Sequence, residues 1–298
     1  MSNILGTGVA LITPFNNNSS IDFKSLANLI EHVINGGVDF LVILGTTAET
    51  TSLSVEEKKE VINFIIEKNK RRLPLVLGIG GNNTDKVIKE ILSTDLSSFA
   101  AILSVTPYYN KPSQEGLYSH YKEISQASPI PIILYNVPSR TACDLRPETV
   151  MRLADHPNIV GIKEALDDVA RLNELMAISD SQIDTKYFSI LSGDDQTFNS
   201  FMANGGDGVI SVAANIIPSQ ISQICSLNLT KQFADASELN SIYTNIFELL
   251  FVESNPIPVK WMLQRMERIG SGIRLPLVPF SKDFHEKTIN EMIKLKLL

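Results

Sequence analysis

The chain has little cysteine, histidine or tryptophan. Its 298 residues include two cysteines, four histidines and one tryptophan. Two cysteines that form no CxxC pair cannot build the disulfide framework of a small secreted domain. The histidines form no HxH or HExxH spacing, and Walker and nucleophile-elbow motifs are missing too. The sequence therefore predicts no metal site and no cofactor. The four histidines are His32, His120, His156 and His285.

The chain also lacks blocks of charge and long apolar runs. It has 26 Lys and Arg residues against 33 Asp and Glu residues, a net charge of -7, and these charges are scattered. A binding surface for nucleic acid or for an anionic membrane would need clustered basic residues. No apolar run is long enough to span a bilayer, and the N-terminus has no signal-peptide pattern. These absences predict a cytoplasmic protein.

Short apolar runs recur about every thirty residues, the spacing of βα units. Most of them are unbroken rather than alternating, as in parallel strands that are buried on both faces. Eight units of this kind predict an α/β fold, a (β/α)8 TIM barrel, over residues 1–217. Residues 218–298 are predicted to form the end of the barrel and a C-terminal helical subdomain, and an open doubly wound sheet is the alternative. The eight runs are Val9–Phe15, Phe40–Gly45, Pro74–Gly80, Phe99–Val105, Ile130–Val137, Ile159–Ala165, Phe188–Gly193 and Gly208–Ala213.

One of these runs contains a lysine. Lys163 stands within Ile159–Ala165, where its ammonium group would be costly to desolvate. A buried lysine loses its proton more easily, and a neutral amine attacks carbonyl carbons to form Schiff bases. The alternative is a strand-end lysine whose side chain extends to solvent.

Polar residues follow the ends of other predicted strands, where the active sites of TIM barrels lie. Taken singly, the tyrosines fit a core, the threonines fit strands or helix caps, and the aspartates fit a turn. Taken together, they supply phenols, hydroxyls and a guanidinium beside the lysine amine. This combination favours carbonyl chemistry through an imine, with tyrosine as proton carrier and the threonines as carboxylate binders. The residues are Thr46, Thr47, Tyr108, Tyr109, Tyr135, Arg140, Asp194 and Asp195.

A series of motifs covers nearly the whole chain and resembles the dihydrodipicolinate synthase family. The resemblance implies a lyase that condenses pyruvate with L-aspartate 4-semialdehyde to give 4-hydroxy-tetrahydrodipicolinate, the first committed step of diaminopimelate and lysine biosynthesis. These are small-molecule substrates, and the chemistry needs no cofactor. The motifs are Gly45-Thr46-Thr47, Tyr108-Tyr109-Asn110, Tyr135-Asn136-Val137-Pro138-Ser139-Arg140-Thr141, Gly161-Ile162-Lys163-Glu164-Ala165, Ser192-Gly193-Asp194-Asp195, Gly208-Val209-Ile210-Ser211-Val212, Asn255-Pro256-Ile257-Pro258-Val259-Lys260 and Arg274-Leu275-Pro276-Leu277.

The resemblance implies four catalytic residues. Lys163 resembles the lysine that forms the pyruvate imine, and Tyr135 resembles the proton donor and acceptor. Thr46 and Tyr109 resemble its relay partners. In the family the second tyrosine reaches the active site of a neighbouring subunit, so the resemblance also implies a homotetramer made of two dimers.

Three further residues resemble substrate binders. Thr47 resembles the binder of the pyruvate carboxylate, and the backbone carbonyl of Ile210 is expected near bound pyruvate. Arg140 resembles the arginine that holds the carboxylate of the semialdehyde. A guanidinium suits this role because it can bind a carboxylate through two parallel hydrogen bonds.

Some members of the family are inhibited by lysine, in a pocket at the dimer interface. Asn82 and Tyr108 match two residues of that pocket. Lys86 stands where a glutamate is expected, and Lys58 and Val55 stand where histidines are expected. A positive charge replaces an acceptor for the ammonium of the inhibitor, so weak or absent inhibition is predicted.

The chain departs from the family pattern at two places. Ala48 replaces the second glycine of Gly-Thr-Thr-Gly-Glu, which strains the backbone only if that position needs a positive φ. The stretch between Ala165 and Leu191 is longer than in many members, and Ser179–Asp184 within it is predicted to be a polar surface turn.

Two other functions compete with the synthase. Another pyruvate-dependent lyase, such as N-acetylneuraminate lyase, would share Lys163 and Tyr135, but Thr47 and Arg140 argue against it. A catalytically inactive barrel that serves as a binding or regulatory protein would be expected to have lost one of these residues.

Overall fold

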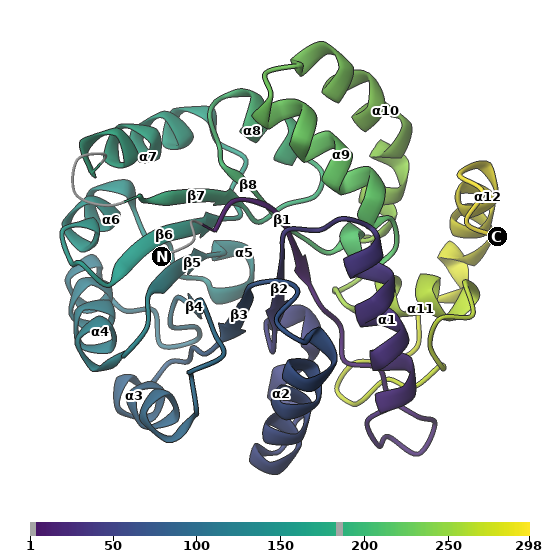
Figure 1. Ribbon diagram of the computed structural model, residues 1–298, viewed down its shortest axis with the longest axis horizontal. Helices are drawn as coiled ribbons and strands as arrows, with labels where there is room; N and C mark the ends of the chain where they lie inside the picture. Colours follow the sequence, from purple (N-terminus) through teal and green to yellow (C-terminus); the bar gives the residue numbers. More distant parts are fainter. Residues whose placement is uncertain (1–3, 183–186) are drawn as a thin grey trace. The chain divides into compact units, whose positions relative to one another are not determined.

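The computed structural model describes residues 4–182 and 187–298 (Figure 1). Within these residues, eight strands form a closed barrel in which each strand lies beside the next in sequence order. The predicted (β/α)8 barrel is thus confirmed, and the open sheet is excluded. The strands are β1 (Gly6–Ala10), β2 (Phe40–Ile43), β3 (Leu75–Gly78), β4 (Ala101–Val105), β5 (Ile132–Asn136), β6 (Ile159–Glu164), β7 (Ser189–Ser192) and β8 (Gly208–Ser211).

The first strand begins and ends earlier than predicted. The prediction was Val9–Phe15, whereas β1 ends at Ala10. The chain beyond Ala10 stays buried. The N–H of Leu11 still donates to the carbonyl of Val42 on β2 at 3.0 Å, but the N–H of Ile12 donates to a side chain instead, Oδ1 of Asn215, at 3.3 Å. A proline follows at position 14 and has no N–H to offer a strand ladder. The apolar run therefore marks burial rather than strand over its second half.

Backbone contacts divide the chain into two compact units. The first unit holds the described residues of Met1–Gly6 and Pro74–Ile210, and the second holds Thr7–Leu73 and Ser211–Leu298. The domain boundary that the sequence places between residues 217 and 218 stays a prediction.

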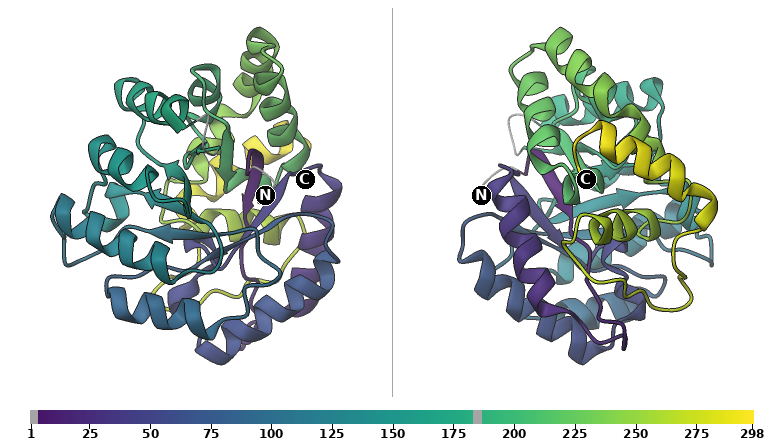
Figure 2. Two further views of the ribbon diagram at one scale, coloured as in Figure 1. Left: turned by 60° about the vertical axis from the view of Figure 1, so that its left-hand side comes forward. Right: turned by 90° about the vertical axis from the view of Figure 1, so that its right-hand side faces the viewer.

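In the first unit, helices cover strands β4 to β7. Helices α3, α4, α6 and α7 lie side by side along these strands (Figures 1 and 2). The core between the two layers contains Tyr121, Leu134, Ile162, Leu175 and Phe188, each almost fully buried. The helices are α3 (Thr84–Ser93), α4 (Gln114–Ala127), α5 (Pro138–Thr141), α6 (Pro147–Ala154), α7 (Val169–Gln182) and α8 (Phe198–Ala203).

The end of α7 corrects the prediction of a surface turn at Ser179–Asp184. The helix continues to Gln182 because its buried face, with Leu175 and Ile178, keeps a helical spacing. Ser179 lies within this helix, and its hydroxyl donates to the carbonyl of Phe188, the residue before β7, at 2.9 Å. Residues 183 and 184 of the predicted turn lie outside the described residues.

The second unit contains the predicted C-terminal helices. Helices α9 and α10 run alongside each other (Figure 2), and the rings of Trp261 and His285 stack at 4.5 Å between centroids. No helix in residues 4–182 and 187–298 is long and apolar enough to cross a bilayer. The helical segments are α1 (Phe23–Asn35), η1 (Thr46–Ala48), η2 (Thr50–Ser52), α2 (Val55–Asn69), η3 (Ala213–Asn215), α9 (Pro218–Leu229), α10 (Phe233–Leu249), α11 (Ile257–Arg265), η4 (Lys282–Phe284) and α12 (His285–Lys294).

Candidate active site

The predicted lysine and tyrosine lie side by side in the first unit. Tyr135 on β5 pairs in register with Lys163 on β6, so both side chains point to the same face of the sheet. Lys163 is 6% exposed and Tyr135 is 7% exposed. The Nζ atom of the lysine lies 4.2 Å from the centre of the tyrosine ring. A buried amine thus has a phenol beside it, as imine chemistry with proton transfer requires.

A glycine directly after the next strand, β7, makes room for the lysine. A Cβ atom at Gly193 would lie 2.9 Å from Cε of Lys163 and 2.9 Å from Cβ of Ala165. A larger residue would therefore displace the lysine. The neighbouring aspartate forms the expected turn, because Oδ2 of Asp194 accepts a hydrogen bond from the N–H of Thr197 at 3.0 Å.

The residues that follow the tyrosine and the lysine form a buried charged network. Asn136 donates to both carboxylate oxygens of Glu164 at 3.1 Å and to Oδ1 of Asp144 at 2.9 Å. Nε of Arg171 donates to Oε2 of Glu164 at 2.6 Å, and its Nη2 lies 3.0 Å from Oδ1 of Asp144. Burial raises the pKa of Glu164, and the guanidinium of Arg171 opposes that rise. The network ties the ends of β5 and β6 together.

The sequence analysis missed this network, although it contained a signal for it. A carboxylate within the apolar run Ile159–Ala165 needs a partner, just as the lysine beside it does. The partner, Arg171, stands only seven residues after Glu164. Its role depends on the start of α7 folding back over the strand.

The other residues of the first unit that the sequence predicts for a binding or catalytic site lie at the surface or in the barrel. Arg140 is exposed on α5, and Ile210 is buried in β8. Tyr109 is 88% exposed and has a φ of 75°, which is unusual for a bulky residue. Asn82 and Tyr108 are brought together, because Nδ2 of the asparagine donates to the tyrosine carbonyl at 3.1 Å.

The two lysines expected at the effector pocket lie on helices. Lys86 is exposed on α3, in the first unit. Lys58 is half-buried on α2, in the second unit, and Val55 at the start of that helix is 61% exposed. The effector pocket itself stays a prediction.

The predicted threonines lie in the second unit, in the turn after β2. Thr46 is exposed and Thr47 is 4% exposed. Nδ2 of Asn255 donates to the hydroxyl oxygen of Thr47 at 2.9 Å. Two residues later, Oε1 of Glu49 accepts from Nζ of Lys260 at 2.5 Å, and both side chains are buried. Burial lowers the pKa of Lys260, and the carboxylate of Glu49 opposes that change.

The departure from the family pattern in this turn, Ala48 in place of a glycine, has a simple structural account. In this turn φ is positive at Leu44 and Glu49, both at 53°, and not at Ala48. Alanine at position 48 is therefore unstrained. The carboxylate contact with Lys260 helps to hold Glu49 in its left-handed conformation.

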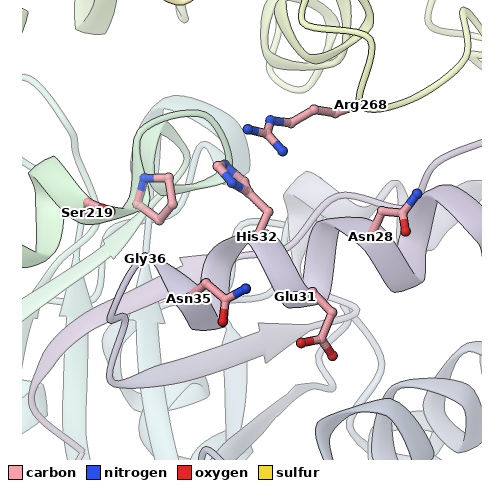
Figure 3. Close-up of a pocket in the computed structure, with 8 residues that line it drawn as sticks. Asn28, Glu31, His32, Asn35, Gly36, Ser219 and Arg268 are labelled. Carbon is pink, nitrogen blue, oxygen red and sulfur yellow. The ribbon is translucent and has the colours of Figure 1, made fainter.

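A surface pocket of about 390 Å³ lies elsewhere in the second unit, between α1 and the start of α9 (Figure 3). The imidazole of His32 and the guanidinium of Arg268 both extend into it. Burial lowers the pKa of His32, and Glu31 is already paired with Arg72 at 2.5 Å. None of the predicted site residues lines this pocket. Its lining is Asn28, Glu31, His32, Asn35, Gly36, Pro218, Ser219 and Arg268.

Comparison with known proteins gives one consistent result. A sequence model of the dihydrodipicolinate synthetase family matches residues 3–295. A 4-hydroxy-tetrahydrodipicolinate synthase of Flavobacterium psychrophilum is 46% identical over 288 residues, which cover 96% of this chain and 97% of that protein. A protein of the same name from Coxiella burnetii is 44% identical over 282 residues, with 95% of each chain covered.

A solved structure agrees with these relatives. The chloride-inhibited dihydrodipicolinate synthase of Acinetobacter baumannii, solved in complex with pyruvate, is 43% identical to this chain. The two structures superpose with a TM-score of 0.94, and the match covers 99% of this chain and 100% of the other. The similarity therefore extends over the barrel and the C-terminal helices alike.

Proposed function

The chain belongs to the dihydrodipicolinate synthetase family, and we propose that it condenses pyruvate with L-aspartate 4-semialdehyde to give 4-hydroxy-tetrahydrodipicolinate. It is a lyase of this family's type. The observation that carries the proposal is the buried amine of Lys163 beside the ring of Tyr135. The relatives' names and the pyruvate complex of the Acinetobacter baumannii protein support the choice of substrates.

Lys163 supplies the nucleophile of the proposed reaction. Its amine attacks the keto carbon of pyruvate, and loss of one water gives an imine. The imine makes the methyl group of pyruvate acidic, so that loss of a proton gives an enamine. The enamine carbon then bonds to the aldehyde carbon of the semialdehyde. Attack by the amino group of that substrate on the imine carbon closes the ring and frees the lysine.

Tyr135 carries the protons of these steps. Its ring contacts the lysine amine, so its hydroxyl is well placed to exchange protons with groups bound there. We assign Thr46 and Tyr109 as its relay partners because their motifs match the family. The exposure of Thr46 fits a hydroxyl that meets substrate or a partner rather than one that fills a core.

The carboxylates of the two substrates have separate binders in this proposal. Thr47 binds the pyruvate carboxylate, and the carbonyl of Ile210 lies near bound pyruvate. Arg140 binds the carboxylate of the semialdehyde, a role that fits its exposed position after β5.

We propose in addition that the protein is a homotetramer of two dimers, in which Tyr109 enters the site of a neighbour. An aromatic side chain that is 88% exposed on a strained backbone is explained if a partner covers it. Sedimentation at assay concentration tests this assembly. A fully active monomer would contradict it. The cytoplasmic location stays a prediction.

A substrate comparison tests the function. The protein is incubated with pyruvate and either L-aspartate 4-semialdehyde or N-acetylmannosamine, and products are followed by mass spectrometry. Pyruvate should be consumed when the semialdehyde is the second substrate and not when N-acetylmannosamine is. Consumption with the amino sugar would instead favour an N-acetylneuraminate lyase, and consumption with neither would favour a binding or regulatory protein.

A further inference from the structure

The segment at the start of α11 holds the threonine turn at two points. Asn255 is 6% exposed and donates to Thr47, which lies 208 residues earlier in the chain. Lys260, one turn further along, is 4% exposed and pairs with Glu49. All four residues belong to the second unit. Both contacts are buried, so water does not compete for them.

The direction of the first contact determines what the Thr47 hydroxyl can do. A hydroxyl has one proton to donate and two lone pairs that accept. The amide nitrogen of Asn255 can only donate, and it occupies one of those lone pairs. The proton of the Thr47 hydroxyl is therefore available to another acceptor. Accepting a hydrogen bond also makes a hydroxyl a stronger donor.

We propose that Asn255 is a positioning residue, which presents the Thr47 hydroxyl as a hydrogen-bond donor to the carboxylate of pyruvate. The pairing of Lys260 with Glu49 holds the turn in the conformation that this contact needs. The inference rests on the proposed function, in which Thr47 binds that carboxylate. A carboxylate accepts hydrogen bonds and cannot donate them, so the orientation of this one proton decides whether the contact forms.

Asn255→Asp tests the direction of the contact while keeping the size of the side chain. An aspartate accepts only, so it turns the Thr47 proton towards itself and places a negative charge beside the Thr47 hydroxyl. The readout is the pyruvate concentration that gives half-maximal borohydride trapping of the imine, which does not depend on the second substrate. We expect this concentration to rise about tenfold or more, as for loss of a hydrogen bond to a charged group. The KM for the semialdehyde should change little.

Asn18→Asp is the matched control. Asn18 is exposed in the same unit, and its Oδ1 accepts from the N–H of Ser20 at 3.1 Å and from its hydroxyl at 2.7 Å. An aspartate keeps both contacts and makes the same change of charge. Half-maximal trapping should stay at the wild-type concentration.

A double-variant cycle separates positioning from general loosening of the fold. Asn255→Ala should raise the half-maximal pyruvate concentration in the wild type and in Thr47→Ser, which keeps the hydroxyl. In Thr47→Val it should add little, because no hydroxyl is left to orient. Thermal unfolding shows whether each variant is folded. If Asn255→Ala does not fold, the trapping measurement on Asn255→Asp tests the positioning role.

The possible failures have different causes. Unchanged trapping in Asn255→Asp, or an equal effect of Asn255→Ala with and without the Thr47 hydroxyl, would overturn the positioning role and leave the proposed function standing. Unchanged pyruvate binding in Thr47→Val would overturn both the role of Thr47 and the inference. A wild type that is not trapped by borohydride would overturn the proposed function itself.

Discussion

The charged network of Asn136, Asp144, Glu164 and Arg171 predicts a large loss of stability for Arg171→Met. Glu164 has a side chain that is 1% exposed, and Arg171 is its partner at 2.6 Å. Methionine keeps much of the apolar stem but leaves the carboxylate without its counter-charge. Breaking a buried ion pair in this way costs about 3–5 kcal/mol. Asp144, whose side chain is 39% exposed, can be hydrated again and should add little to the loss.

The loss should depend on pH with a definite sign. Burial already raises the pKa of Glu164, and without the guanidinium the pKa rises further. The folded variant then binds a proton more tightly than the unfolded chain does. Its free energy of unfolding therefore falls, relative to the wild type, as pH rises through the raised pKa. The difference in free energy of unfolding between the wild type and Arg171→Met should be smaller at about pH 5 than at about pH 8.

Urea unfolding at a fixed protein concentration measures this difference. Arg152→Met is the matched control, because Arg152 pairs with Glu115 at 2.9 Å on the exposed face of the same unit and should matter little. The double variant Arg171→Met with Glu164→Gln should recover part of the loss, since no buried charge remains. A loss under about 1 kcal/mol, or one that does not change with pH, would refute the reasoning.

Other predictions concern the active site. Tyr135→Phe should lower kcat by about two to four powers of ten with folding intact, and an unchanged kcat would make this tyrosine a packing residue. Arg140→Ala should raise the KM for the semialdehyde about ten- to a hundredfold and that for pyruvate far less, whereas equal effects on both would contradict its role. Lysine should inhibit weakly or not at all, because the charges of Lys58 and Lys86 oppose its ammonium group; a dose–response assay with half-inhibition at submillimolar lysine would overturn this.

The sequence predicted the barrel well because parallel strands buried on both faces leave unbroken apolar runs. The spacing of Ser54 and Glu57 is also that of a capping box, and the two residues form its reciprocal hydrogen bonds at the start of α2. The prediction was wrong where a buried stretch is not a strand, as after Ala10. It was also wrong at Ser179, where polar residues continue a helix whose other face is buried.

The pairing of Tyr135 with Lys163 could be predicted because both stand at the ends of successive strands. The contacts that support the site could not. Asn255 meets Thr47 across 208 residues of sequence, and neither residue type signals such a partner. The sequence shows that Glu164 needs a cationic partner but does not show which one. Only the folded chain brings Arg171, near the start of α7, and Asn136 into contact with this carboxylate.

The most direct test of the central claim is borohydride reduction in the presence of pyruvate. The protein is digested after reduction, and the modified peptide is identified by mass spectrometry. We expect a single site of modification, at Lys163, and none in Lys163→Ala, while Lys260→Ala should still be modified at Lys163 if it folds. Modification of another lysine, or trapping that persists in Lys163→Ala, would show that Lys163 is not the nucleophile.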